Sequence, residues 1–288
     1  MRVIVHGGAG ASPDEPDERQ AVLDDAASTA VDEPTPTDAV CTAINVLESS
    51  PRFNAGVGSA VQSDGYVRTD AGLMTDDRAA GAACSMPGVE HAVDVARIVK
   101  EETPHVLVAG VHAVDLAAAF DVDVGVDLWT EASRARWDEL DSHPEGDARE
   151  QTEWVRERFG EGHDTVGSVA TDGDVVAAAT STGGRWLALA GRVGDVPQIG
   201  SGFYCDAAGG ASATGAGEDI ARTTLSRRAV ELLDDGYGAE RAAEAAIDEF
   251  GDAVDGSAGL VLMTPDGDGG SAYNSDAMQT SIAGAPVT

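Results

Sequence analysis

Residues 162–168 are Gly162-His163-Asp164-Thr165-Val166-Gly167-Ser168, and they mark the sharpest change in amino-acid composition in a chain of 288 residues. The residues before them, Asp127 to Gly162, are rich in charge and carry three of the four tryptophans. A charged stretch of this length predicts a long exposed connection, helical near Ala148–Arg158. The residues from Thr165 onward form strands readily, so the chain should enter a strand at that threonine.

Beyond this junction a hairpin is expected, because Asp172-Gly173 separates two strand-forming runs, Thr165–Ala170 and Val175–Thr180. Glycine-rich loops then carry the chain to Gly215. The remaining pattern predicts two helices followed by two strands, near Glu218–Leu233, Ala239–Phe250, Gly259–Met263 and Ser271–Asn274.

The part before the junction shows a similar order of elements. Val3-Ile4-Val5 predicts a buried strand that ends in His6-Gly7-Gly8-Ala9-Gly10, and Thr35 and Thr37 are candidate caps for the second helix. The other expected elements are helices near Glu18–Val31, Thr37–Leu47, His91–Glu101 and Val111–Phe120, a hairpin of Ala60–Gln62 with Tyr66–Arg68, and a strand at Ala79–Cys84. This order favours helices packed outside antiparallel sheets over a wound βαβ sheet.

The charge of the chain is extreme. There are 51 acidic residues against 18 basic ones, a formal net charge of −33, and Lys100 is the only lysine. The acidic residues are scattered, which indicates a folded domain with an acidic surface rather than an acidic tail. Such a surface repels nucleic acid and anionic membranes, because both are bound through lysine and arginine. The acidic groups repel one another, and dissolved salt screens this repulsion. We therefore expect a salt-adapted protein.

The cysteines and the N-terminus predict the compartment. Cys41, Cys84 and Cys205 are widely separated and lack metal-ligand spacing, so we expect buried thiols in a reducing environment. The apolar run at Met1–Val5 is too short for a signal peptide, and no segment approaches about 18 consecutive apolar residues. We therefore expect a cytoplasmic protein.

Several common enzyme motifs are absent from the sequence, namely G-x-S-x-G, G-x-x-x-x-G-K-[ST] and H-E-x-x-H. The six histidines show no ligand spacing, and Asp266–Gly270 lacks the closing glutamate of a calcium loop. What remains is a concentration of hydroxyls and glycines with one Arg/Asp pair, in the blocks Thr165-Val166-Gly167, Thr180-Ser181-Thr182-Gly183-Gly184, Gly191-Arg192-Val193-Gly194-Asp195 and Ala213-Thr214-Gly215-Ala216-Gly217.

In this order, and together with His6–Gly10, Phe53–Gly56 and Asp70-Ala71, these blocks resemble the plant-type asparaginases, also called isoaspartyl aminopeptidases, and the related glycosylasparaginases. The resemblance covers nearly the whole chain and weakens over 127–164, where the family has a variable linker. It implies an α+β fold, a four-layer αββα sandwich with two antiparallel sheets between helical layers. It also implies one domain, 1–288, that matures into an alpha chain of 1–164 and a beta chain of 165–288, and a dimer of such pairs.

The resemblance further implies a chemistry. The precursor cuts itself between Asp164 and Thr165, and the freed α-amine of Thr165 serves as general base for its own hydroxyl. That hydroxyl attacks the side-chain amide of L-asparagine or of a β-aspartyl peptide. Thr182 orients the nucleophile, while the Thr214 hydroxyl and the Gly215 N–H stabilise the oxyanion.

Substrate binding is also implied by the resemblance. Arg192 binds the α-carboxylate, and Asp195 binds the α-ammonium with help from the Gly217 carbonyl. Asn54 has a supporting place. No cofactor is required, although the family's loop can hold a structural sodium ion through main-chain carbonyls, here those of Leu47, Glu48, Ser50, Phe53, Ala55 and Val57.

Two departures leave alternatives open. Val196, after Asp195, stands where the family usually has serine. His163-Asp164 resembles the glycosylasparaginase branch, whereas Ser181-Thr182-Gly183-Gly184 resembles the asparaginase branch. One alternative is therefore a glycosylasparaginase. An alternative of another class is a non-catalytic amino-acid-binding protein on the same fold, against which the complete set of threonines argues.

Overall fold

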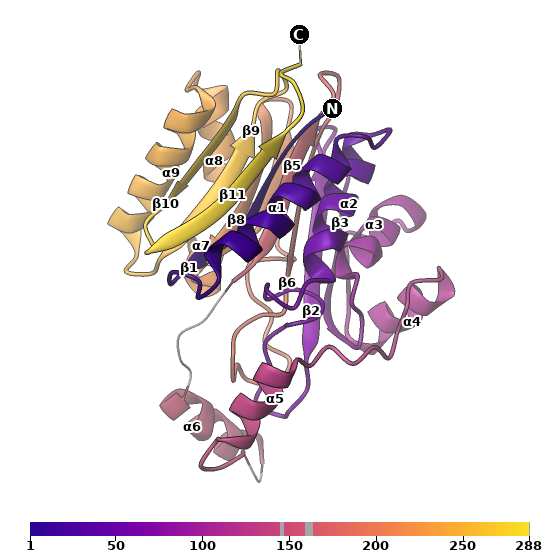
Figure 1. Cartoon of the computed structure of the whole chain (residues 1–288), viewed down its shortest axis with the longest axis vertical. Coiled ribbons are helices and arrows are strands. Elements are labelled where there is room, and N and C mark those ends of the chain that lie inside the picture. Colours follow the sequence, from indigo (N-terminus) through magenta and orange to yellow (C-terminus); the bar gives the residue numbers. More distant parts are fainter. Residues whose placement is uncertain (145–146, 159–163, 288) are drawn as a thin grey trace.

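The computed structural model describes residues 1–144, 147–158 and 164–287, in which two stacked β-sheets lie between layers of helices (Figure 1). The first is a seven-stranded sheet. Its strands, in spatial order, are β11 (Ala277–Ala283), β1 (Arg2–Gly10), β5 (Val166–Thr171), β6 (Val176–Thr182), β2 (Arg68–Thr75), β3 (Ala80–Pro87) and β4 (Leu107–Ala109). The second sheet has four strands, in the order β10 (Gly269–Tyr273), β9 (Ala258–Met263), β8 (Gly209–Gly215) and β7 (Phe203–Asp206).

Helices cover the outer face of each sheet. The first sheet packs against α1 (Pro16–Ala30), α2 (Pro36–Glu48) and α3 (Ala92–Glu102), and the second against α8 (Leu225–Asp234) and α9 (Ala239–Ala253). The other helices are α4 (Val111–Ala119), α5 (Glu131–Asp138), α6 (Ala148–Arg158) and α7 (Gly217–Thr223). The order helix, sheet, sheet, helix confirms the expected four-layer sandwich.

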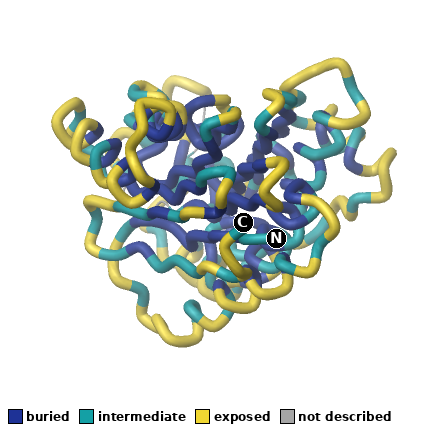
Figure 2. Tube along the Cα trace, turned by 90° about the horizontal axis from the view of Figure 1, so that it is seen from above, coloured by how far each residue is buried: buried dark blue, intermediate teal, exposed yellow. Residues whose placement is uncertain are grey.

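Small residues on the central strands let the layers pack closely. Along β5 and β6, side chains alternate between the two hydrophobic cores: Val169 and Ala178 face the second sheet, whereas Ala170 and Ala179 face the helices. A Cβ at Gly72 of β2 would lie 2.0 Å from the Phe203 ring, so only glycine permits this approach of the sheets. Figure 2 shows the buried inner layers, with exposed residues at the periphery.

Many expected elements are confirmed. Thr35 caps α2 by accepting from the Asp38 N–H at 3.1 Å, and α6 spans the expected Ala148–Arg158. The expected hairpin near Asp64-Gly65 is reduced to a single bridge between Val61 and Val67.

Other expectations need correction. The predicted helix near Glu218–Leu233 is broken at Thr224, whose left-handed φ of 51° separates α7 from α8. The stretch expected as glycine-rich loops contains β7 and β8. Strand β8 pairs with β9, and β7 pairs with β8, so pairing makes strands of a sequence with little strand propensity. Strands β2, β4 and β11 and helix α5 were not expected. The first sheet is antiparallel except at its edge, where β4 pairs parallel to β3.

Cys41, Cys84 and Cys205 are buried and form no disulfide, as expected. Among the described residues, no helix is both long enough and apolar enough to cross a bilayer.

Candidate active site

Thr165 lies directly before β5, near the middle of the first sheet, and only 5 % of its surface is exposed. Because Val166 pairs with Ser181 in the antiparallel register, Thr165 faces Thr182 at the end of β6. The Thr165 hydroxyl donates to Oγ1 of Thr182 at 3.3 Å. The hairpin that the sequence predicted therefore brings these two hydroxyls together.

The peptide carbonyl of Asp164 is bound by two donors. Nδ2 of Asn54 lies 2.7 Å from this oxygen, and Oγ1 of Thr182 lies 3.2 Å from it. Oγ1 of Thr182 also accepts from the Gly184 N–H at 3.1 Å. A hydroxyl has one proton, so Thr182 donates that proton to the Asp164 carbonyl and accepts from Thr165 and Gly184.

Asn54 is held in one orientation by hydrogen bonds at both ends of its amide. Its Nδ2 also donates to the Gly184 carbonyl at 2.6 Å, and its Oδ1 accepts from the Ala60 N–H at 2.7 Å. Its main-chain carbonyl accepts from the Gly183 N–H at 2.8 Å. Exchange of the amide oxygen and nitrogen would break all three side-chain bonds, so Nδ2 must face Asp164.

The side chain of Asp164 lies against β1, where the strand register shifts between His6 and Ala9. It pairs with Arg19 at 3.1 Å, and Arg19 also donates to the Gly7 carbonyl and lies over the Phe53 ring, 4.8 Å from its centroid. Gly8 has a φ of 114°, and a Cβ there would lie 2.7 Å from Oδ1 of Asp164. Gly8 thus makes room for Asp164, and Gly7 makes room for the Phe53 ring, 2.6 Å from the position of a Cβ. Sequence reasoning could not single out Arg19, because its partner is 145 residues away.

Thr214 and Gly215 end β8 in the facing sheet. Thr214 is fully buried, and its Oγ1 accepts from the Ala9 N–H at 3.2 Å. Ala9 follows Gly8, which contacts Asp164, so Thr214 lies at the same end of the sandwich as Thr165. Gly215 has a φ of 133°, and a Cβ there would lie 2.4 Å from the Ser257 carbonyl, which accounts for glycine at this position.

Arg192, Asp195 and Gly217 form a second group. A Cβ at Gly217 would lie 2.6 Å from Oδ1 of Asp195 and 2.8 Å from Nη2 of Arg192, so the glycine brings both side chains together. Glu218, which the sequence did not single out, accepts from Nε and Nη2 of Arg192, each at 2.9 Å. Its position next to Gly217, at the start of α7, could have identified Glu218 from the sequence as a neighbour of the site.

Two buried carboxyls near Arg192 have shifted pKa values. Burial raises the pKa of Asp195 to about 7, although the Arg192 charge opposes that shift. Burial likewise raises the pKa of Asp70 to about 7; Asp70 pairs with Thr182 across β2 and β6 and accepts from the Ser85 N–H at 2.6 Å. Oδ2 of Asp195 is buried and lacks a hydrogen-bond partner among the described residues. This oxygen is available to a ligand cation.

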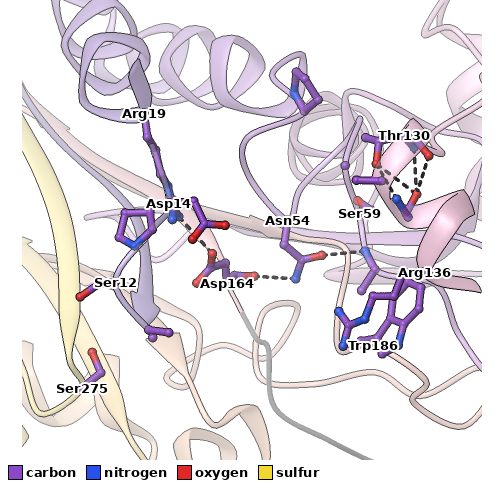
Figure 3. Close-up of a pocket in the computed structure, with 18 of the residues that line it drawn as sticks. Ser12, Asp14, Arg19, Asn54, Ser59, Thr130, Arg136, Asp164, Trp186 and Ser275 are labelled. Atoms are coloured by element: carbon purple, nitrogen blue, oxygen red, sulfur yellow. Dashed lines mark hydrogen bonds and ion pairs between the residues drawn. The ribbon is translucent and has the colours of Figure 1, made fainter. Parts of the chain in front are cut away.

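A cavity of about 970 Å³ opens at Asp164, and Asn54 and Arg19 belong to its lining (Figure 3). Arg192 and Asp195 do not line it. The group of Arg192, Asp195 and Gly217 therefore lies outside this cavity.

The expected sodium loop closes on itself. The Glu48 carbonyl accepts from the Val57 N–H at 2.8 Å, the Leu47 carbonyl from Ser50 at 3.2 Å, and the Ser50 carbonyl from Phe53 at 3.3 Å. The Leu47 carbonyl also accepts from the Ser49 N–H, whereas the Glu48 and Ser50 carbonyls each keep a second lone pair to which a cation can bind. Within the described residues, no cluster of three His, Cys, Asp or Glu side chains could hold a metal ion. The motif residue His163 lies outside the described residues.

A threonine at the start of a central strand in a four-layer sandwich, with its hydroxyl bonded to a second threonine, is the arrangement typical of the class of N-terminal-nucleophile hydrolases. The chain belongs to the asparaginase family, whose sequence model matches residues 1–287.

Curated relatives extend over almost the whole chain. It is 38% identical to a plant-type L-asparaginase of Pyrococcus abyssi, over 96% of this chain and 94% of the relative. It is 39% identical to a plant-type L-asparaginase of Pyrobaculum calidifontis, with the same coverage of both chains. It is 35% identical to the human isoaspartyl peptidase/L-asparaginase, over 98% of this chain and 92% of the relative.

Proposed function

We propose that this protein cuts itself between Asp164 and Thr165 and then hydrolyses the side-chain amide of L-asparagine and the isopeptide bond of β-aspartyl peptides. The observation that carries the proposal is the buried Thr165 hydroxyl, hydrogen-bonded to Thr182 and directly following a carbonyl that Asn54 and Thr182 bind. The names of the relatives, L-asparaginase and isoaspartyl peptidase, support the substrate class.

Self-cleavage begins when Oγ1 of Thr165 attacks the Asp164 carbonyl carbon. The developing oxyanion is stabilised by Nδ2 of Asn54 and by the Thr182 hydroxyl, which already contact that oxygen. The C–N bond then breaks, the hydroxyl proton passes to the Thr165 nitrogen, and an ester remains. The α-amine of Thr165 is free from that point, and water then hydrolyses the ester, which gives a carboxylate at Asp164 and frees the Thr165 hydroxyl.

The mature enzyme uses a different oxyanion site. The freed α-amine removes the proton from Oγ1 of Thr165, and Oγ1 attacks the substrate amide carbon. Because Oγ1 of Thr214 accepts from the Ala9 N–H, its own proton is free for the substrate oxygen, beside the Gly215 N–H. The α-amine then protonates the leaving nitrogen, and water releases aspartate from the acyl-enzyme.

The zwitterionic end of the substrate binds at Arg192 and Asp195. Glu218 occupies the Nε and Nη2 side of Arg192, so the edge that includes Nη1 faces the substrate carboxylate. Asp195 offers its unpartnered Oδ2 to the α-ammonium, with the Gly217 carbonyl beside it. Opposite charges at a fixed separation select an α-amino acid.

The remaining parts of the proposal concern the setting of the enzyme. We place the protein in the cytoplasm of a cell with high internal salt, as a dimer of cleaved pairs, without nucleic-acid or membrane partners. The loop of 47–57 would hold sodium as a structural ion that takes no part in the reaction.

The proposed activity is tested by ammonia release from L-asparagine in molar KCl. Wild-type protein should release ammonia, and Thr165→Ala, purified in parallel and folded by circular dichroism, should release none. Activity in Thr165→Ala, or none in cleaved wild-type protein, contradicts the proposal.

A further inference from the structure

The cavity beside Asp164 is too large for asparagine alone, at about 970 Å³. On one side its walls come from the connection around α5, from the loop of Asn54 to Ala60, and from Trp186 after β6 (Figure 3). On the other side they come from residues 10–14 and 274–276, which bring the carboxylates of Asp14 and Asp276 to the far wall. A space of this size, next to the bond that Thr165 breaks, suits a further part of the substrate.

The chemistry indicates which part of the substrate lies there. The α-amine of Thr165 must protonate the leaving nitrogen, so that nitrogen has to lie beside it. Before cleavage the α-amine nitrogen of Thr165 is the amide nitrogen of the Asp164–Thr165 peptide, bonded to the Asp164 carbonyl carbon. The leaving group therefore occupies the Asp164 side of Thr165, which opens into the cavity, and the aspartyl part lies toward Arg192.

Arg136 of α5 lies in the cavity wall, and its guanidinium lies over the Trp186 ring, 4.3 Å from the centroid. Figure 3 shows the two side chains next to each other, beside Ser59. The structure gives Arg136 no ion pair with any part of the chain that it describes, although the chain carries 51 acidic residues. By contrast, Arg19 in the same cavity is paired with Asp164.

Helix α5, which carries Arg136, is anchored by two sets of contacts. Thr130 and Ser133 form a capping box at the start of α5, with bonds of 2.9 and 3.0 Å. Trp137 packs against a small hydrophobic cluster that contains the buried Trp186. These contacts fix α5 beside Trp186, and Arg136 is an exposed residue of this helix that lines the cavity and contacts the Trp186 ring.

We propose that Arg136 binds the free carboxylate of the leaving residue, and so makes β-aspartyl dipeptides with a free C-terminus preferred substrates. The proposal rests on the hydrolase function proposed above. The carboxylate of such a leaving residue is separated from the scissile nitrogen by only the α-carbon, so it lies in the same cavity. A guanidinium stacked on an aromatic ring suits it, because stacking leaves the planar donors free at the edge. In a protein of net charge −33, an anionic leaving group needs such a cation.

The test compares kcat/KM for a β-aspartyl dipeptide with a free carboxylate and for the same dipeptide as its C-terminal amide, at one KCl concentration. Wild-type enzyme should prefer the free acid by about tenfold, the usual scale of a charge-assisted hydrogen bond near solvent. In Arg136→Gln this preference should fall to near unity. Arg134→Gln is the matched control, because Arg134 lies on the same helix but pairs with Asp127. It should keep the wild-type preference.

Turnover of L-asparagine by Arg136→Gln shows that the variant is folded; if there is none, Arg136→Lys replaces it and should show a reduced preference. No preference in the wild type, or an unchanged preference in the variant, overturns the assignment of Arg136. Failure of the wild type on asparagine and on both dipeptides overturns the proposed function instead.

Discussion

Replacing Asn54 by alanine should slow self-cleavage strongly and also lower the stability of the fold. The substitution removes three side-chain hydrogen bonds, to the Asp164 carbonyl at 2.7 Å, the Gly184 carbonyl at 2.6 Å and the Ala60 N–H at 2.7 Å. At about 1 kcal/mol net for each bond, the free energy of unfolding should fall by about 3 kcal/mol. Loss of one oxyanion donor should slow cleavage by roughly 10²–10³-fold.

The assay follows the uncut chain after refolding in molar KCl, by densitometry of a denaturing gel, with thermal melts recorded on the same samples. Asn45→Ala is the matched control, because the Asn45 amide lies on α2 and makes only two bonds of 3.3 Å to Asp94. It should be cleaved at the wild-type rate. If folded Asn54→Ala is also cleaved at that rate, Asn54 does not stabilise the cleavage oxyanion.

Three further predictions concern the substrate site and the surface. Arg192→Lys should raise KM for asparagine strongly, because an ammonium cannot replace the planar guanidinium, yet self-cleavage should continue; wild-type kinetics would refute this assignment. Because burial raises the pKa of Asp70 and of Asp195 to about 7, the folded protein keeps protons that the unfolded chain loses near pH 4. These two carboxyls should therefore lower the melting temperature as pH rises from about 4 to about 7, whereas buried His6, whose pKa burial lowers to about 3, acts in the opposite direction. Asp195→Asn should make the change in melting temperature between pH 4 and pH 7 less negative, and an unchanged profile would count against the role of Asp195. Stability should rise steeply toward molar KCl, given the net charge of −33, and equal melting temperatures in low and molar salt would contradict salt adaptation.

The central pair of hydroxyls was singled out from the family resemblance, and the hairpin expected from the local sequence explains how the two come together. Asp172-Gly173 sets the turn of a hairpin, and the register of that hairpin places Thr165 against Thr182. The helices at the outer faces were also predictable, because their apolar periodicity is local. In such cases the tertiary structure agrees with the local preference of the chain.

The elements that sequence reasoning missed depend on distant partners. Strand β8 runs from Gly209 to Gly215, five of its seven residues are glycine or alanine, and it becomes a strand by pairing with β9 and β7. The ion pairs of Arg19 and of Arg192 join residues 145 and 26 positions apart. Nothing in the local pattern indicates which acidic residue, out of 51, meets each arginine.

The most direct test of the account is the intact mass and N-terminal sequence of freshly purified protein. We predict two chains, residues 1–164 and 165–288, the second beginning Thr165-Val166-Gly167-Ser168. Thr165→Ala should remain one chain. A fully active wild-type protein that stays uncut, or a Thr165→Ala variant that is cut or active, would contradict the role of Thr165 as the nucleophile of both reactions.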